Sequence, residues 1–371
     1  MADGVTNRQL FFIIIITAIG YSAVEIPRIM AETAGTGAWL TLLLGAVFFA
    51  VDAFIIAYLG YAYRGKTLFE YARLLAGKTM ACLIAIIYMM YFFVLLTFII
   101  RFSADIIKDE ILFKTPVWAT MLLLLTISLY GASKGLTNIG RIIEYLGLII
   151  LIIGFVLHFM CFSQGNILNI MPMFDPSVKN LYFEALPGTI FCFLGFEIIT
   201  IIPFSKRNSS TVLWTAIISI FVLCIFFIMI VESCYAILSV EDIINYTHPL
   251  IVAIRRLDIA ILQFAKRLDL FFIMIWLAAI FCSVSIISFT TAEYTKKLVP
   301  KLKGNRILIA IGTLAFIAGL LLPNAEEVSK LFIRFVTYFG LIPAFAIPLI
   351  LLIIHIFRPK NDVKKDRKLK I

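Results

Sequence analysis

The feature that most constrains this chain is a series of long apolar runs separated by short polar gaps. Each run has about 20 residues, the length of an α-helix that crosses the hydrocarbon core of a bilayer. With 62% hydrophobic and 15% charged residues among 371, the composition excludes a soluble globular protein and indicates an all-α integral membrane protein. The predicted spans are 10–30, 38–61, 80–104, 116–134, 143–163, 183–203, 212–236, 268–293, 305–322 and 332–357.

The distribution of Lys and Arg predicts the orientation of these spans. If the N-terminus is cytoplasmic, 21 of the 32 basic residues fall in cytoplasmic segments, an excess typical of membrane proteins. We therefore expect one transmembrane domain over 1–357, both termini in the cytoplasm, and a basic tail over 358–371. The tail either binds anionic membrane lipid or only fixes the orientation. Because the net charge of +10 resides in loops and tail, it does not indicate nucleic-acid binding.

The segment Pro187–Pro203, which reads PGTIFCFLGFEIITIIP, is unlike a plain membrane anchor. Gly188 and Gly195 weaken a helix locally, and the flanking prolines leave backbone groups without helical partners. Glu197 adds a carboxylate at bilayer depth, where a charge costs about 2.5–3.5 kcal/mol and normally faces a protein interior or a wet cavity. We therefore predict a broken helix at a small-molecule site.

The first span carries a similar interruption. Residues 19–28 read IGYSAVEIPR, with Gly20, the carboxylate Glu25 and then Pro27. Interrupted segments at corresponding places in two halves are the best sequence indication of a transporter-type site near the bilayer midplane. Because five spans per half is an odd number, we expect inverted repeats over about 10–163 and 183–357, with helices 1 and 6 broken.

Two interpretations of these interruptions remain open. Glycines can serve close helix packing and prolines can make kinks, with no ligand involved. Alternatively, freed N–H groups bind a carboxylate and freed carbonyls bind an ammonium group, which together suit an amino acid. The matched pair of interruptions, each with a carboxylate nearby, favours the ligand site.

A set of short motifs extends along nearly the whole chain. They are Gly20 to Arg28 with Ala31-Glu32 and Ala34-Gly35, Gly65-Lys66-Thr67-Leu68-Phe69-Glu70, Gly195-Phe196-Glu197 with Pro203-Phe204, and Pro249-Leu250, Arg267-Leu268-Asp269 and Trp276. In their order and spacing the sequence resembles the spore germination B-subunit permeases of the GerAB type, a branch of the amino acid–polyamine–organocation (APC) superfamily. The superfamily's first break usually reads Gly-x-Gly, whereas this chain has Gly20-Tyr21-Ser22.

The resemblance implies a LeuT-like five-plus-five fold and a nutrient germinant receptor subunit of the spore inner membrane. Such a subunit binds an amino acid, nucleoside or similar nutrient, acts with A-type and C-type subunits and triggers germination. Candidate ligand-binding residues, from the two breaks and by analogy with the fold, are Gly20, Tyr21, Ser22, Tyr91, Phe191, Cys192, Gly195 and Glu197.

Four further residues are candidate proton or cation sites. Asp52 lies in the middle of span 2, where it either titrates or serves as a structural hydrogen-bond partner. Glu25 follows the first interruption. Ser285 and Ser288 in span 8 either coordinate a cation or pack against neighbouring helices.

Nothing in the sequence indicates an enzyme, a metal site or a cofactor. The three histidines are scattered, the six cysteines show no paired spacing, and no Gly-rich phosphate loop is present. Two other functions remain open beside the receptor subunit. One is a proton-coupled amino acid transporter of the same superfamily, and the other is a membrane scaffold whose site is filled by Tyr21 and Ser22.

Overall fold

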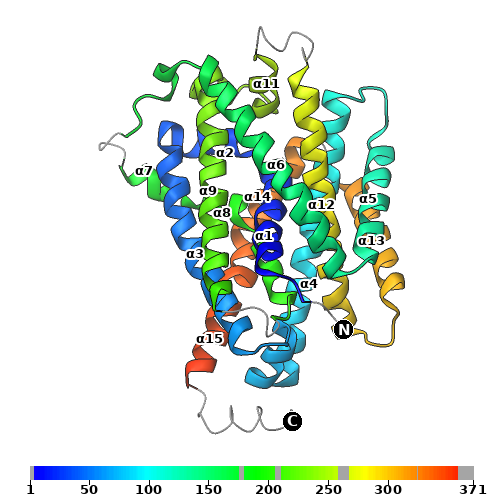
Figure 1. The fold of residues 1–371 in the computed structure, drawn as a ribbon. Helices are drawn as coiled ribbons and strands as arrows, with labels where there is room; N and C mark the ends of the chain where they lie inside the picture. Colours follow the sequence, from blue (N-terminus) through cyan, green and yellow to red (C-terminus); the bar gives the residue numbers. More distant parts are fainter. Residues whose placement is uncertain (1–3, 175–178, 205–209, 258–266, 324, 358–371) are drawn as a thin grey trace.

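A computed structural model describes residues 4–174, 179–204, 210–257, 267–323 and 325–357. Figure 1 shows a bundle of helices in which most of the long helices run between the two ends of the molecule. Helix α1 (Asn7–Ser22) begins and α15 (Ile347–Phe357) ends towards the lower end in that view, which we call the termini end. The predicted basic tail, 358–371, lies outside the described residues.

The long helices match the predicted spans closely. Counted over the described residues, seven helical stretches are long and apolar enough to cross a membrane. The shorter apolar helix α5 and the two interrupted helices, 1 and 6, complete the ten predicted crossings. The remaining long helices are α3 (Ala38–Ala62), α4 (Leu68–Glu110), α5 (Val117–Ser133), α6 (Leu136–Gln164), α9 (Thr211–Leu238), α12 (Leu268–Leu298), α13 (Gly304–Leu321) and α14 (Ala325–Phe335).

Helix 1 consists of α1 and α2 (Ile26–Ala34), joined by a turn at 23–25. The sequence placed this interruption at Gly20-Tyr21-Ser22, but α1 continues through Ser22, so that position was wrong by one helical turn. The cause is Pro27, which has no N–H to donate to the carbonyl of Ala23 and clashes with it. Gly20 serves another purpose, because a Cβ there would lie 2.1 Å from Oγ of Ser283 in α12.

Helix 6 consists of α8 (Leu186–Phe193) and a 3₁₀ helix, η4 (Phe196–Ile201), separated by Leu194 and Gly195. Pro187 stands in the first turn of α8, where its missing N–H costs no helical bond. The predicted interruption at Gly195 is present.

Helix 10 departs from the straight span predicted for 332–357. Two short π-helical stretches, Val336–Gly340 and Ile342–Ala346, separate α14 from α15. Widened turns of this kind leave irregular backbone bonding, and Tyr88 of α4 donates a 2.6 Å hydrogen bond to the carbonyl of Pro343.

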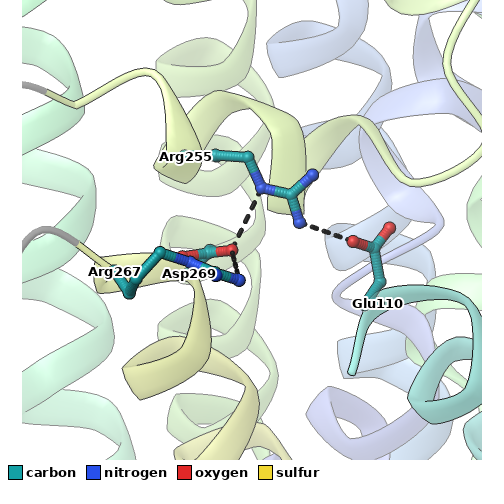
Figure 2. Close-up of polar contacts among 4 residues, drawn as sticks. All are labelled: Glu110, Arg255, Arg267 and Asp269. Carbon is teal, nitrogen blue, oxygen red and sulfur yellow. Dashed lines mark hydrogen bonds and ion pairs between the residues drawn. The ribbon is translucent and has the colours of Figure 1, made fainter. Parts of the chain in front are cut away.

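The end opposite the termini is held by a polar network. Helix α11 (Pro249–Arg255) lies at this end (Figure 1), and 258–266 lies outside the described residues. Figure 2 shows Arg255 between two carboxylates, with bonds of 2.6 Å to Glu110 at the end of α4 and 3.0 Å to Asp269 in the first turn of α12. Arg267 also bonds Asp269. The hydrogen bond to Glu110 raises the pKa of the Arg255 guanidinium above its usual value.

At the termini end, the residues of α4 that precede Gly77 form a short helical segment ahead of span 3. At the start of α4, the amide of Thr67 donates a 3.0 Å hydrogen bond to Oε2 of Glu70, so that this otherwise free amide has a partner. Gly77 bends α4 with φ +86°, which separates this short helix from the membrane span. Lys297, in the last turn of α12, lies 2.8 Å from Glu70 and fastens the two helices together.

Candidate ligand-binding site

The candidate site is built on the change of backbone direction between the two halves of helix 6. Leu194 is extended, and Gly195 has φ +106° and ψ −20°, in the left-handed region that side chains rarely adopt. A Cβ at Gly195 would also lie 3.1 Å from Cγ2 of Thr17 in α1. Glycine is therefore required both by backbone conformation and by the approach of helix 1.

Glu197 lies in the first turn of η4 and is fully buried. Its Oε2 accepts a 2.6 Å hydrogen bond from the amide of Gly195 and a 3.2 Å hydrogen bond from the hydroxyl of Tyr91 in α4. Its Oε1 has no hydrogen-bond partner among the described residues. The Glu197 carboxylate thus accepts the hydrogen bond of an amide that has no helical partner because the helix is broken. A ligand carboxylate could bind at the same amide.

Tyr21 bonds to the other backbone group that the break leaves without a helical partner, the carbonyl of Leu194. Its hydroxyl donates to the carbonyl of Leu194, and its ring packs edge-on against Phe191 of α8 with the ring centroids 5.5 Å apart. Both Tyr21 and Phe191 also lie edge-on to Phe332 of α14. The structure therefore describes a closed arrangement, in which side chains of the protein satisfy the carbonyl and the amide at the break.

Asp52 of α3 is the second buried carboxyl group of this region. It is fully buried, in the part of the molecule where α3 packs against η4 and the rings of Phe49 and Phe196 are 6.1 Å apart. Neither of its carboxyl oxygens has a hydrogen-bond partner among the described residues. Buried polar groups normally have partners, so an unpartnered carboxyl group at bilayer depth indicates a position for a proton, a cation or a ligand.

Three polar residues that the sequence did not single out extend this region towards the termini end. Thr200 Oγ1 lies 2.5 Å from the carbonyl oxygen of Glu197 and 2.7 Å from the hydroxyl of Tyr294 in α12. Tyr294 stacks on Tyr88, with the ring centroids 5.2 Å apart. Thr200 could have been found from its place three residues after Glu197 on the second half-helix. The tyrosines could not, because aromatic residues are common throughout this chain.

The predicted site residues of helix 1 have mainly local roles. Gly20 allows close approach of α12, where Oγ of Ser283 lies 2.9 Å from the carbonyl oxygen of Ile16. Ser22 donates to the carbonyl of Ala18 in its own helix. Glu25 is buried, and its carboxyl oxygen lies 3.4 Å from the hydroxyl of Ser329 in α14. Tyr21 is the first-span candidate whose hydrogen bond to the helix 6 break is seen among the described residues.

The remaining candidates are spread over the bundle. Cys192 is buried in α8, with its sulfur 3.8 Å from the carbonyl oxygen of Gly188. Ser285 lies beside Gly131 of α5, away from the helix 1 interruption. The hydroxyl of Ser288 is buried without a hydrogen-bond partner in the described part of the chain. Over the same residues, no group of three or more His, Cys, Asp and Glu could hold a metal ion.

An apolar cavity of about 650 Å³ lies behind the break, between α3, α8 and helix 10. Its lining includes Phe48, Ile190 and Phe345, and the rings of Phe48 and Phe345 stack 4.0 Å apart. The cavity therefore adjoins the first half of helix 6 and is not lined by Glu197, and its apolar walls suit acyl chains rather than a charged ligand.

Comparison with known sequences gives the family. The family described as spore germination protein matches residues 4–328. The chain belongs to the spore germination protein family. Spore germination protein YndE of Bacillus subtilis is 27% identical over 359 residues, which cover 96% of this chain and 98% of YndE. Spore germination protein B2 of the same species is 28% identical over 277 residues, 74% of each chain.

Solved structures give the fold of this spore germination family member. Mhp1, a nucleobase-cation-symport-1 family transporter in a closed conformation with bromovinylhydantoin bound, superposes with a TM-score of 0.59 at 13% identity, covering 88% of this chain and 74% of Mhp1. MhsT in complex with L-phenylalanine gives a TM-score of 0.58 at 14% identity, covering 94% and 98% of the two chains. The predicted LeuT-like architecture is thus confirmed, and the protein is a multi-pass membrane protein.

Proposed function

We propose that this chain is a nutrient germinant receptor subunit that binds a small molecule, an amino acid in the first instance, between helix 1 and the helix 6 break. The observation that carries the proposal is the break at Leu194–Gly195 with buried Glu197 bonded across it. The names of the relatives, all spore germination proteins, support the process, and the transporter fold supports a small-molecule site.

Closure and opening of this site would transmit the signal. Tyr21 and Glu197 hold the freed carbonyl and amide in the arrangement described here. A ligand triggers a response only if it binds one conformation more tightly than another, and exchange of the Tyr21 bond to the Leu194 carbonyl for a ligand bond supplies that difference. We propose further that the subunit lies in the spore inner membrane with both termini cytoplasmic and works with A-type and C-type subunits.

The test uses spores of the source organism from which this gene has been deleted. Dipicolinic acid release is followed against single amino acids and nucleosides, in parallel with the parent strain and with a strain complemented by the intact gene. Selective loss of the response to one nutrient, restored by complementation, supports the receptor. Unchanged responses to every nutrient, in a strain that also lacks paralogous receptors, refute it.

A second candidate function is proton-coupled amino acid transport, which the buried pair Asp52 and Glu197 favours. Carboxyl groups at bilayer depth commonly carry the coupling proton of transporters. Uptake of labelled amino acid by the purified subunit in liposomes, dependent on a proton gradient, would support transport. If the subunit in liposomes is stabilised by the ligand but takes up none of it, transport is excluded and the receptor function is supported.

A further inference from the structure

The inference concerns the charge of the ligand, and it rests on the proposed function of the site. Asp52 and Glu197 are both fully buried. They lie where α3 packs against η4, and the rings of Phe49 and Phe196 are there 6.1 Å apart. Among the described residues, neither carboxyl group takes part in an ion pair. Two buried carboxylates without a cation are unfavourable at bilayer depth, so the site is short of positive charge.

The hydrogen-bonding capacity of the two groups is also incomplete. Three carboxyl oxygens lack partners among the described residues: Oδ1 and Oδ2 of Asp52 and Oε1 of Glu197. A primary ammonium group carries one positive charge and three N–H donors. It therefore supplies charge of the sign that the site lacks and one donor for each of the three unpartnered oxygens, and charge-assisted bonds of this kind are the strong ones.

The place for a ligand carboxylate, by contrast, is already taken. The amide of Gly195 is bonded at 2.6 Å to Oε2 of Glu197, and the hydroxyl of Tyr91 donates to the same oxygen. A ligand carboxylate would have to displace Glu197 and would add a third negative charge. The chain thus provides its own anion at the helix 6 break.

We propose that this site selects its ligand through a primary ammonium group held by Asp52 and Glu197, and that a carboxylate on the ligand is dispensable. The substrate class is then primary amines, with amino acids as members recognised by their ammonium group. The carboxylate of an amino acid is then not recognised by Asp52 and Glu197.

The test measures thermal unfolding of the purified full-length chain in lipid nanodiscs with matched probes. Each series contains the amino acid, its decarboxylated amine, its deaminated acid and the uncharged alcohol. The series are alanine, ethylamine, propionate and ethanol; leucine, isoamylamine, isocaproate and isoamyl alcohol; phenylalanine, phenethylamine, phenylpropionate and phenethyl alcohol. In the series whose amino acid stabilises the protein, we expect the amine to stabilise it comparably, and the acid and the alcohol to have no effect.

Other outcomes separate the inference from the proposed function. Stabilisation by the acid as strong as that by the amine, or by inosine with none by any amine, overturns the ammonium site while keeping a ligand site. No stabilisation by any of these probes, by the other amino acids or by nucleosides overturns the proposed function as well.

Three variants locate the effect. Asp52→Asn and Glu197→Gln should each weaken amine binding by about tenfold or more, the loss expected for one charge-assisted bond. Glu232→Gln is the matched control, since Glu232 is also buried, on α9, and its carboxyl oxygens also lack hydrogen-bond partners among the described residues, but it lies near Trp39 at the start of α3 rather than at the helix 6 break. Equal losses in all three variants would overturn the assignment. If Asp52→Asn does not fold, the probe series on the unaltered chain decides.

Discussion

The two interrupted helices look alike in sequence and differ in structure. In helix 1, backbone hydrogen bonds continue through the interruption. The amide of Ala23 donates to the carbonyl of Ile19, and the amide of Glu25 donates to the carbonyl of Ser22. In helix 6, Gly195 turns the chain through the left-handed region and exposes a carbonyl and an amide to the interior. A proline alone makes a kink, whereas a left-handed glycine followed by a buried acid makes a binding position. Four substitutions test this contrast.

The largest effect is expected for Gly195→Val. A β-branched residue at φ +106° is strongly disfavoured, and its side chain would also meet Thr17. The backbone strain alone is of order 1–3 kcal/mol, so we expect folded protein to be largely lost, measured as yield after size exclusion and as thermal unfolding. The control is Gly304→Val, at a helical position with no atom within 4 Å of an added Cβ. Normal folding of Gly195→Val would show that the break is not fixed by this residue.

The next effect is expected for Glu197→Ala. This change leaves the Gly195 amide and the Tyr91 hydroxyl without an acceptor, and each buried unsatisfied group costs about 1–3 kcal/mol. Glu197→Gln keeps an acceptor oxygen and should keep the fold. Glu25→Ala in helix 1 should cost less, because its one described bond is 3.4 Å long. The measurement is denaturant or thermal unfolding in parallel. A larger loss for Glu25→Ala would reverse the ranking of the two breaks.

Gly20→Ala should destabilise the chain by packing alone. The added Cβ would lie 2.1 Å from Oγ of Ser283, and overpacking of this kind costs typically about 1–3 kcal/mol. The double variant Gly20→Ala with Ser283→Gly should recover most of the unfolding temperature, because it makes room. No second substitution of this kind should restore Gly195→Ala, since its loss of stability comes from the backbone conformation at φ +106°. Failure of the double variant would mean that Gly20 has a role other than helix packing.

The smallest effect is expected for Tyr21→Phe. It removes the bond to the Leu194 carbonyl and keeps the ring against Phe191, a loss of about 0.5–1.5 kcal/mol. Ligand stabilisation should increase, because the freed carbonyl becomes available to the ligand. If ligand stabilisation falls instead, Tyr21 itself contacts the ligand. Tyr246→Phe, which removes a hydroxyl that accepts from exposed Arg256, serves as the control.

Most of the architecture could be predicted because hydropathy and length almost determine membrane spans. Helix α3, for example, ends within one residue of the predicted boundary. The break of helix 6 was also predictable, since Gly195 and Glu197 stand out in an apolar run. The position of the helix 1 break was not, because it depends on which carbonyl Pro27 obstructs rather than on where the glycine stands.

The site could be predicted only in part. Glu197, Tyr21 and Tyr91 were predicted at the ligand site, and they lie together at the helix 6 break, where they bond to its backbone or to one another. Their contact with a ligand stays a prediction. Side-chain bonds between distant segments, such as Thr200 to Tyr294, leave no periodic trace in a sequence. Ser285 shows the converse, because a hydroxyl on a span can turn towards any neighbouring helix, here α5.

The two halves of helix 6 are anchored unequally, which has a mechanical consequence. The second half is tied to α12 through Thr200 and Tyr294, whereas the first half adjoins the apolar cavity of about 650 Å³. If helix 6 rotated about Gly195, η4 would therefore stay in place and α8 would move into the cavity. Any molecule in the cavity, including an acyl chain of the surrounding bilayer, would oppose this movement of α8.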